Sequence, residues 1–273
     1  MGQFDGILIC TDLDGTLLSS DHRISKENLE AIAYFKQEGG IFTFVTGRMP
    51  FFVSDMYEAV QPNAPFGCVN GGGLYDHRKQ EYIWTREMPR SVLPLIQSVE
   101  ECFPGVGIQV NTFHHTYFCK ENLTMEKFRA STGLPNLVRG YRDVDEPIAK
   151  IVFGSESDEE ILAIQAHLLA HPLASNFDFI RSERTLYEIL PKGSGKGTSI
   201  VQLCRHLNLD PHKTIALGDY NNDISMFYAA EVGIAVSNAS PEALEAADYV
   251  TVSNDEHAIA QVIRDLAAGK FLA

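Results

Sequence analysis

Two carboxylates stand two residues apart near the start of the chain. Asp12 and Asp14 follow the apolar run 7–10 and precede a Gly15-Thr16 turn. Two like charges about 4 Å apart repel by about 4 kcal/mol at an effective dielectric constant near 20. The chain already carries a formal net charge of -14. We therefore expect a cation to lie between the two side chains.

Polar residues also follow three other apolar runs. These clusters are Thr46-Gly47-Arg48, Asn70-Gly71-Gly72-Gly73 and Gly218-Asp219-Tyr220-Asn221-Asn222-Asp223. In an open parallel sheet, ligands bind beyond the carboxyl ends of the strands. The recurrence of polar clusters after successive strand-like runs therefore predicts one shared site.

The residue types in these clusters favour phosphoryl transfer. Carboxylates such as Asp12, Asp14, Asp219 and Asp223, without a neighbouring His or Cys, are hard oxygen ligands that suit Mg²⁺ better than zinc. Hydrogen-bond donors for an anion come from Thr46 and the amides around Gly47, and a fixed positive charge comes from Lys196. A metal, a lysine and a hydroxyl around a carboxylate are typical of a phosphoryl-transfer site.

The elements around these clusters alternate between strand and helix. Buried strands are expected at 6–10, 41–45 and 66–69, with helices at 25–38 and 51–60, and the same alternation returns after Pro191. This pattern predicts a parallel sheet covered by helices on both faces. Between the two stretches, strands come in adjacent pairs, as in an antiparallel sheet. We expect an α/β core, 1–83 and 190–273, interrupted by an α+β insert at 84–189.

The motifs resemble those of the haloacid dehalogenase (HAD) superfamily. Asp12-Leu13-Asp14-Gly15-Thr16 resembles its D-x-D-G-T signature, and its other three motifs are matched in order by Thr46, Lys196 and the stretch from Gly218 to Asp223. An insert between the second and third motifs is similar to the C2B cap of the Cof-type phosphatases (subfamily IIB). The resemblance covers essentially the whole chain and implies a Rossmann-like HAD core with an inserted α+β cap.

The resemblance also implies a role for each motif residue. Asp12 would attack phosphorus and form an aspartyl-phosphate, while Asp14 would protonate the leaving alcohol and later accept a proton from water. The ligands of Mg²⁺ would be Asp12, Asp219 and the backbone carbonyl of Asp14, with Asp223 bound through water or anchoring the site. The phosphoryl oxygens would be held by Thr46 and Lys196, with Asn222 and the Gly47 amide nearby. For two residues, two interpretations remain open. Arg48 is expected either to anchor its loop or to contact the substrate, and Asn70 either to hold its turn or to face the substrate.

The function predicted is a Mg²⁺-dependent phosphatase of small phosphorylated metabolites, such as sugar phosphates or phosphorylated cofactors. One alternative is a phosphotransferase or phosphomutase of the same superfamily. A nucleotide-binding P-loop is a less favoured interpretation. That motif needs Gly at the position of Leu190 and Ser or Thr at the position of Gly197. A non-catalytic binding protein is not favoured, since all the motif residues are intact.

Composition limits the partners and the compartment. The 36 Asp and Glu outnumber the 22 Lys and Arg, which argues against nucleic acid or an anionic membrane as a general partner. No apolar run approaches the ~20 residues needed to cross a bilayer, and no signal-peptide pattern opens the chain. The five cysteines form no C-x-x-C pair, as expected for reduced thiols. We expect a soluble cytoplasmic protein; the pattern does not indicate its oligomeric state.

Overall fold

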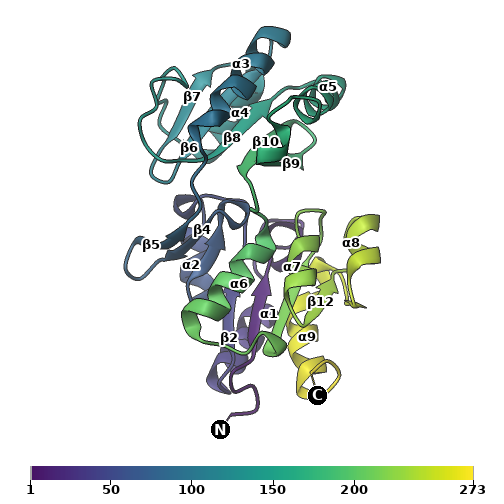
Figure 1. Ribbon diagram of the computed structural model, residues 1–273. Coiled ribbons are helices and arrows are strands. Elements are labelled where there is room, and N and C mark those ends of the chain that lie inside the picture. The colour runs from purple at the N-terminus through teal and green to yellow at the C-terminus, as the bar shows by residue number, and fades with distance from the viewer. Residues whose placement is uncertain (1, 273) are drawn as a thin grey trace. The chain divides into compact units, whose positions relative to one another are not determined.

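The computed structural model describes residues 2–272 and divides into two compact units (Figure 1). One unit is formed by the residues up to Thr85 together with those from Gly195 onward, and the other is Arg86–Ser194. The first unit carries all the predicted site residues and is called the catalytic unit. The second is called the insert unit. Each is described by itself.

A parallel sheet forms the centre of the catalytic unit. Its strand order is β13-β12-β11-β1-β2, and each neighbouring pair is parallel. The strands are β1 (Leu8–Thr11), β2 (Ile41–Phe44), β11 (Thr214–Gly218), β12 (Val232–Ala235) and β13 (Tyr249–Val250). The residues of β1, β11 and β12 are all buried, which requires helices on both faces of the sheet.

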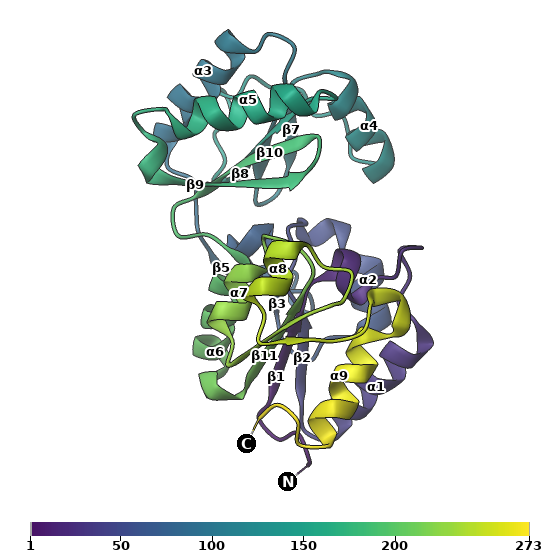
Figure 2. The ribbon, with the colours of Figure 1, turned by 90° about the vertical axis from the view of Figure 1, so that its right-hand side faces the viewer.

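Helices supply that cover on two sides (Figure 2). Lying together on one face are α1 (Lys26–Gln37) and α9 (Ala258–Ala267), and on the other face are α6 (Lys196–Leu207) and α7 (Ile224–Ala229). Two shorter helices, α2 (Ser54–Val60) and α8 (Pro241–Ala246), complete the unit. The start of α1 follows its sequence signal, since the Ser25 side chain accepts a hydrogen bond from the Asn28 N–H. The predicted α/β architecture is confirmed.

The third strand differs from the prediction. The sequence suggests that 66–69 continues the parallel sheet, but β3 (Phe66–Cys68) begins an antiparallel sheet with β4 (Gly73–Asp76) and β5 (Glu81–Thr85). A single isolated bridge, Val45 to Gly67, links β3 to the end of β2 among the described residues. That bridge is parallel, as the prediction requires, but Val69 and Asn70 both have positive φ, so the chain turns back after three residues and β3 also pairs with β4.

The insert unit has an antiparallel sheet with the strand order β7-β6-β8-β10-β9. Its elements are β6 (Gly107–Thr112), β7 (Thr116–Lys120), β8 (Ile148–Gly154), β9 (Phe177–Glu183), β10 (Leu186–Pro191), α3 (Leu93–Cys102), α4 (Leu123–Thr132) and α5 (Asp158–Leu169). Side chains alternate between the two faces of β8, so that Ile151 and Phe153 join the main core with α3 and α5, whereas Val152 packs in a smaller core beside α4. The predicted α+β character of the insert is confirmed.

No helix within residues 2–272 combines the length and the apolar character needed to cross a membrane.

Candidate active site

A wide turn at the end of β1 presents the first two carboxylates. Asp12 precedes the turn η1 (Leu13–Leu17), and its carbonyl accepts a hydrogen bond from the Leu17 N–H at 3.3 Å. Gly15, at the tip of the turn, has a φ of +82°, and a Cβ atom there would lie 2.4 Å from Asp219 Oδ2. Glycine is therefore favoured at position 15 for two reasons, which are the backbone conformation and the close approach of Asp219.

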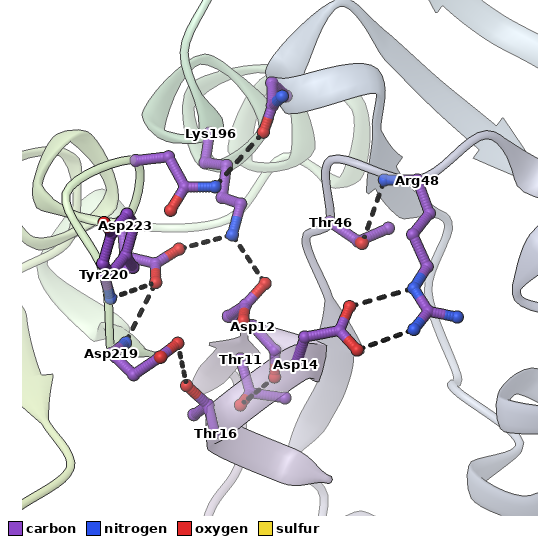
Figure 3. Close-up of polar contacts among 12 residues, drawn as sticks. Thr11, Asp12, Asp14, Thr16, Thr46, Arg48, Lys196, Asp219, Tyr220 and Asp223 are labelled. Atoms are coloured by element: carbon purple, nitrogen blue, oxygen red, sulfur yellow. Dashed lines mark hydrogen bonds and ion pairs between the residues drawn. The ribbon is translucent and has the colours of Figure 1, made fainter. Parts of the chain in front are cut away.

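Lys196 contacts residues from both stretches of the chain that form the catalytic unit (Figure 3). It is the first residue of α6, and its Nζ donates hydrogen bonds to Asp12 Oδ1 and to Asp223 Oδ1, both at 2.6 Å. Its side chain is only 2% exposed. Burial alone would lower the pKa of Lys196, but the carboxylates of Asp12 and Asp223 outweigh this effect and raise it. The lysine is therefore a permanent positive charge inside the site.

Asp219 and Asp223 follow β11, at the neighbouring strand end. One oxygen of Asp223 accepts hydrogen bonds from the backbone N–H groups of Asp219 (2.9 Å) and Tyr220 (3.0 Å). Its other oxygen binds Lys196, so Asp223 holds the loop and the lysine together. The Asp219 carboxylate is fixed from the other side by Thr16, whose hydroxyl donates to Oδ1 at 3.1 Å.

Asp12, Asp219 and Asp223 form a compact acidic cluster. Each offers a carboxylate oxygen, and these atoms lie within 4.8 Å of one another. Burial and the charge of Asp223 raise the pKa of Asp219 to about 6. Burial also raises the pKa of Asp12. With all three carboxylates ionised, the single charge of Lys196 leaves two negative charges in excess. Hard oxygen donors with that excess fit a divalent cation such as Mg²⁺.

Asp14 points away from this cluster, toward Arg48 (Figure 3). The Arg48 Nε donates to Asp14 Oδ2 at 2.9 Å, and its Nη2 donates to Asp14 Oδ1 at 2.6 Å. The Asp14 side chain is 45% exposed and the Arg48 side chain is 31% exposed. Arg48, expected from the sequence to anchor its loop or to meet the substrate, thus has a carboxylate partner inside the catalytic unit.

The remaining predicted residues line the neighbouring strand ends. Thr46 is buried after β2, and its hydroxyl oxygen accepts a hydrogen bond from the Arg48 N–H at 3.1 Å. Asn222 Nδ2 donates to Asn70 Oδ1 at 3.4 Å, and a Cβ atom at Gly47 would lie 2.8 Å from that same oxygen. The structure therefore brings every predicted site residue to one end of the catalytic unit.

Two residues that contact the site were not among the predicted site residues. Thr16 binds Asp219, and Asn238 donates from Nδ2 to the Gly15 carbonyl at 2.9 Å, which braces the turn that carries Asp14. Both had a signal in the sequence: Thr16 lies in the D-x-D-G-T stretch, and Asn238 follows β12, another strand that ends at this edge.

Comparison with known proteins agrees with this geometry. A family model described as haloacid dehalogenase-like hydrolase matches residues 9–263. The chain belongs to this family. The predicted membership is confirmed, and so is the prediction of an enzyme of the phosphatase type.

Two curated relatives and two solved structures illustrate the similarity. This hydrolase is 26% identical to phosphatase YwpJ of Bacillus subtilis (95% of this chain, 99% of the relative). It is 27% identical to the 5-amino-6-(5-phospho-D-ribitylamino)uracil phosphatase YwtE of the same organism (96% and 99%). Its fold matches that of BT4131, titled a HAD subclass IIB sugar phosphatase, with a TM-score of 0.83 at 21% identity over 95% of this chain and 98% of the other. A protein from Streptococcus mutans UA159 also gives a TM-score of 0.83, at 23% identity over 96% and 98%.

Proposed function

We propose that this hydrolase is a Mg²⁺-dependent phosphatase of small phosphorylated metabolites that works through an aspartyl-phosphate on Asp12. The observation that carries the proposal is the acidic cluster, in which the buried Asp12 accepts a hydrogen bond from Lys196 and lies close to Asp219 and Asp223. A lysine and three carboxylates are suited to receive a divalent cation and a phosphate dianion together.

The residues that would hold Mg²⁺ are Asp12, Asp219 and the backbone carbonyl of Asp14. Asp223 would act through water or as the anchor that its two backbone hydrogen bonds suggest. When bound, the ion supplies positive charge for the carboxylates and for the phosphoryl oxygens, which otherwise repel each other.

The chemistry assigned to the side chains has two steps. In the first, a carboxylate oxygen of Asp12 forms a bond to phosphorus while the bond to the ester oxygen breaks, and Asp14 gives its proton to the departing alkoxide. In the second, Asp14 takes a proton from water, whose oxygen bonds to phosphorus as the bond to Asp12 breaks. The products are an alcohol, inorganic phosphate and the regenerated carboxylate.

Hydrogen-bond donors around the cluster would hold the transferring phosphoryl group. The groups proposed for its oxygens are the Thr46 hydroxyl, the Lys196 ammonium group, the Gly47 amide and the Asn222 side chain, and Asn70 is a further candidate from the sequence. Such fixed donors stabilise the charge that develops in the transition state.

The proposed substrates are sugar phosphates or phosphorylated cofactors. One relative is named as a phosphatase of a phosphoribitylamino-uracil, and a protein of the same fold is titled a sugar phosphatase, which supports a small, polar phosphate ester. Neither nucleic acid nor a membrane is proposed as a partner, in keeping with the acidic composition. A cytoplasmic location is proposed with it.

The test is the release of inorganic phosphate from a panel of phosphorylated metabolites and from p-nitrophenyl phosphate. The wild-type protein should lose activity with a chelator and regain it with Mg²⁺. Asp219→Asn should need at least about tenfold more Mg²⁺ for half-maximal rate. Asp21→Asn, which changes an exposed aspartate outside the cluster, is the matched control. Full activity in the presence of chelator, or phosphate moved to an acceptor without release, would overturn the proposal.

A further inference from the structure

Arg48 grips the Asp14 carboxylate with two hydrogen bonds. Nε and Nη2 of the guanidinium group each donate to a different carboxylate oxygen, at 2.9 and 2.6 Å. This two-point, charge-assisted geometry fixes the plane of the carboxylate as well as its position. The Asp14 side chain is 45% exposed, so without such a partner it would be free to change rotamer.

The backbone of Arg48 is itself held in place. Its N–H donates to Thr46 Oγ1 at 3.1 Å, and its carbonyl accepts from the Val69 N–H at 3.1 Å. The guanidinium group therefore extends from a loop fixed at both its amide and its carbonyl. The loop after β2 therefore holds the side chain of Asp14, which belongs to the turn after β1.

Separate cations hold the two carboxylates of the D-x-D stretch. Lys196 binds Asp12, the proposed nucleophile, whereas Arg48 binds Asp14, the proposed proton donor and acceptor. The proposed nucleophile and the proposed proton donor therefore have different cationic partners.

We propose that Arg48 is a positioning residue that orients Asp14 for proton transfer to the leaving group. This inference rests on the proposed phosphatase function. When Asp14 carries the proton, one of its oxygens still accepts a hydrogen bond from Arg48 while the other donates to the departing oxygen. When Asp14 is ionised, both hydrogen bonds form, and the carboxylate lies ready to receive a proton from water. The contrasting reading of Arg48 is a direct ligand of the substrate phosphate.

Two substrates separate these readings. An aryl ester such as p-nitrophenyl phosphate has a leaving group that departs as an anion, whereas an alkyl ester such as glycerol 3-phosphate needs a proton on its leaving oxygen. In Arg48→Gln, the ratio of kcat/KM for the alkyl ester to kcat/KM for the aryl ester should fall by about 10- to 100-fold. Asp14→Asn should lower the same ratio. Arg78→Gln, which changes an exposed arginine of the same unit, should leave the ratio unchanged.

Three further measurements make the result specific. The double variant Arg48→Gln/Asp14→Asn should show a ratio no lower than that of Asp14→Asn alone, because Arg48 acts through Asp14. Arg48→Lys keeps the charge but loses the two-point grip, so its ratio should lie between those of wild type and Arg48→Gln. The inhibition constant of inorganic phosphate should change by less than about threefold in Arg48→Gln.

An equal loss for both esters, together with at least tenfold weaker inhibition by phosphate, would overturn the inference and assign Arg48 to the phosphate. That outcome leaves the proposed function standing, because the wild type would still hydrolyse both esters. Wild-type protein that hydrolyses neither ester would instead contradict the proposed function itself.

Discussion

Lys196 is the residue on which the charge balance of the site depends. It lies between Asp12 and Asp223, with almost no exposed surface. Lys196→Met would leave two buried carboxylates without their cation. We expect it to lower the free energy of unfolding of the metal-free protein by roughly 3 to 5 kcal/mol.

Lys26→Met is the matched control for that measurement. Lys26 is also the first residue of a helix, but its ion pair with Glu30 is exposed, so the change should cost less than about 0.5 kcal/mol. Urea unfolding in the presence of chelator gives both values. Equal losses for the two variants would show that Lys196 does not compensate a buried charge.

Gly15 links the turn after β1 to Asp219. Gly15→Ala would place a methyl group 2.4 Å from Asp219 Oδ2 on a backbone with positive φ. We expect a loss of about 1 to 2 kcal/mol in stability and a Mg²⁺ requirement raised at least about tenfold. Gly133→Ala has a similar φ of +66° but open space around it, so it should lose comparable stability with no change in the Mg²⁺ requirement. A normal Mg²⁺ requirement in Gly15→Ala would contradict the contact.

Most of these residues could be proposed as site residues from the sequence alone, but their pairing could not. Asp12, Lys196 and Asp219 were predictable because motif types and strand ends can be read along the chain. The partner of Arg48 was not, since the contact depends on which way a long side chain turns after β2. The role of Asn238 depends similarly on the side-chain direction after β12.

At the level of elements, the positions at which strands end were predictable from the sequence. The strands with which they pair were not all predictable. The apolar run 66–69 looks like another parallel strand, but the positive φ values of Val69 and Asn70 reverse the chain. Such φ values are rare for a β-branched residue, so the conformational preference of valine does not predict the turn at Val69. The same turn places Asn70 beside Gly47 and Asn222.

A buried ion pair between β8 and β10 offers a test at the same scale. Lys150 Nζ donates to both oxygens of Glu188, at 3.0 and 2.9 Å, and the two side chains are 11% and 4% exposed. Lys150→Met should cost about 3 to 5 kcal/mol, because it removes one partner of a buried ion pair. The double variant Lys150→Met/Glu188→Leu should recover most of that loss in urea unfolding. A double variant less stable than the single one would contradict this expectation.

At the level of the whole molecule, the chain leaves the catalytic unit once and returns to it. The ends of the insert unit lie close together, since Arg86 Nη1 donates to the Lys192 carbonyl at 2.8 Å. The insert unit also has its own core between its sheet and two of its helices. We expect the fragment 86–194 to fold alone and to unfold in one cooperative urea transition, followed by circular dichroism. A gradual, non-cooperative change would show that its core needs the catalytic unit.

The catalytic unit is assembled from both ends of the polypeptide. Asp12 and Asp219 are more than two hundred residues apart, yet they share one cluster because β1 and β11 are neighbours in the sheet. Sequence alternation predicted both strands, and the rule for ligand sites in parallel sheets predicted their convergence.

The central step of the proposed mechanism is the bond between a carboxylate oxygen of Asp12 and phosphorus. During turnover of p-nitrophenyl phosphate, rapid acid quenching followed by borohydride reduction and peptide mass spectrometry locates any phosphorylated carboxylate. We predict reduction at Asp12 in the wild type and none at that position in Asp12→Asn, whose rate should fall at least about a thousandfold. Steady turnover by Asp12→Asn, or a reduced carboxylate at another residue, would contradict the mechanism.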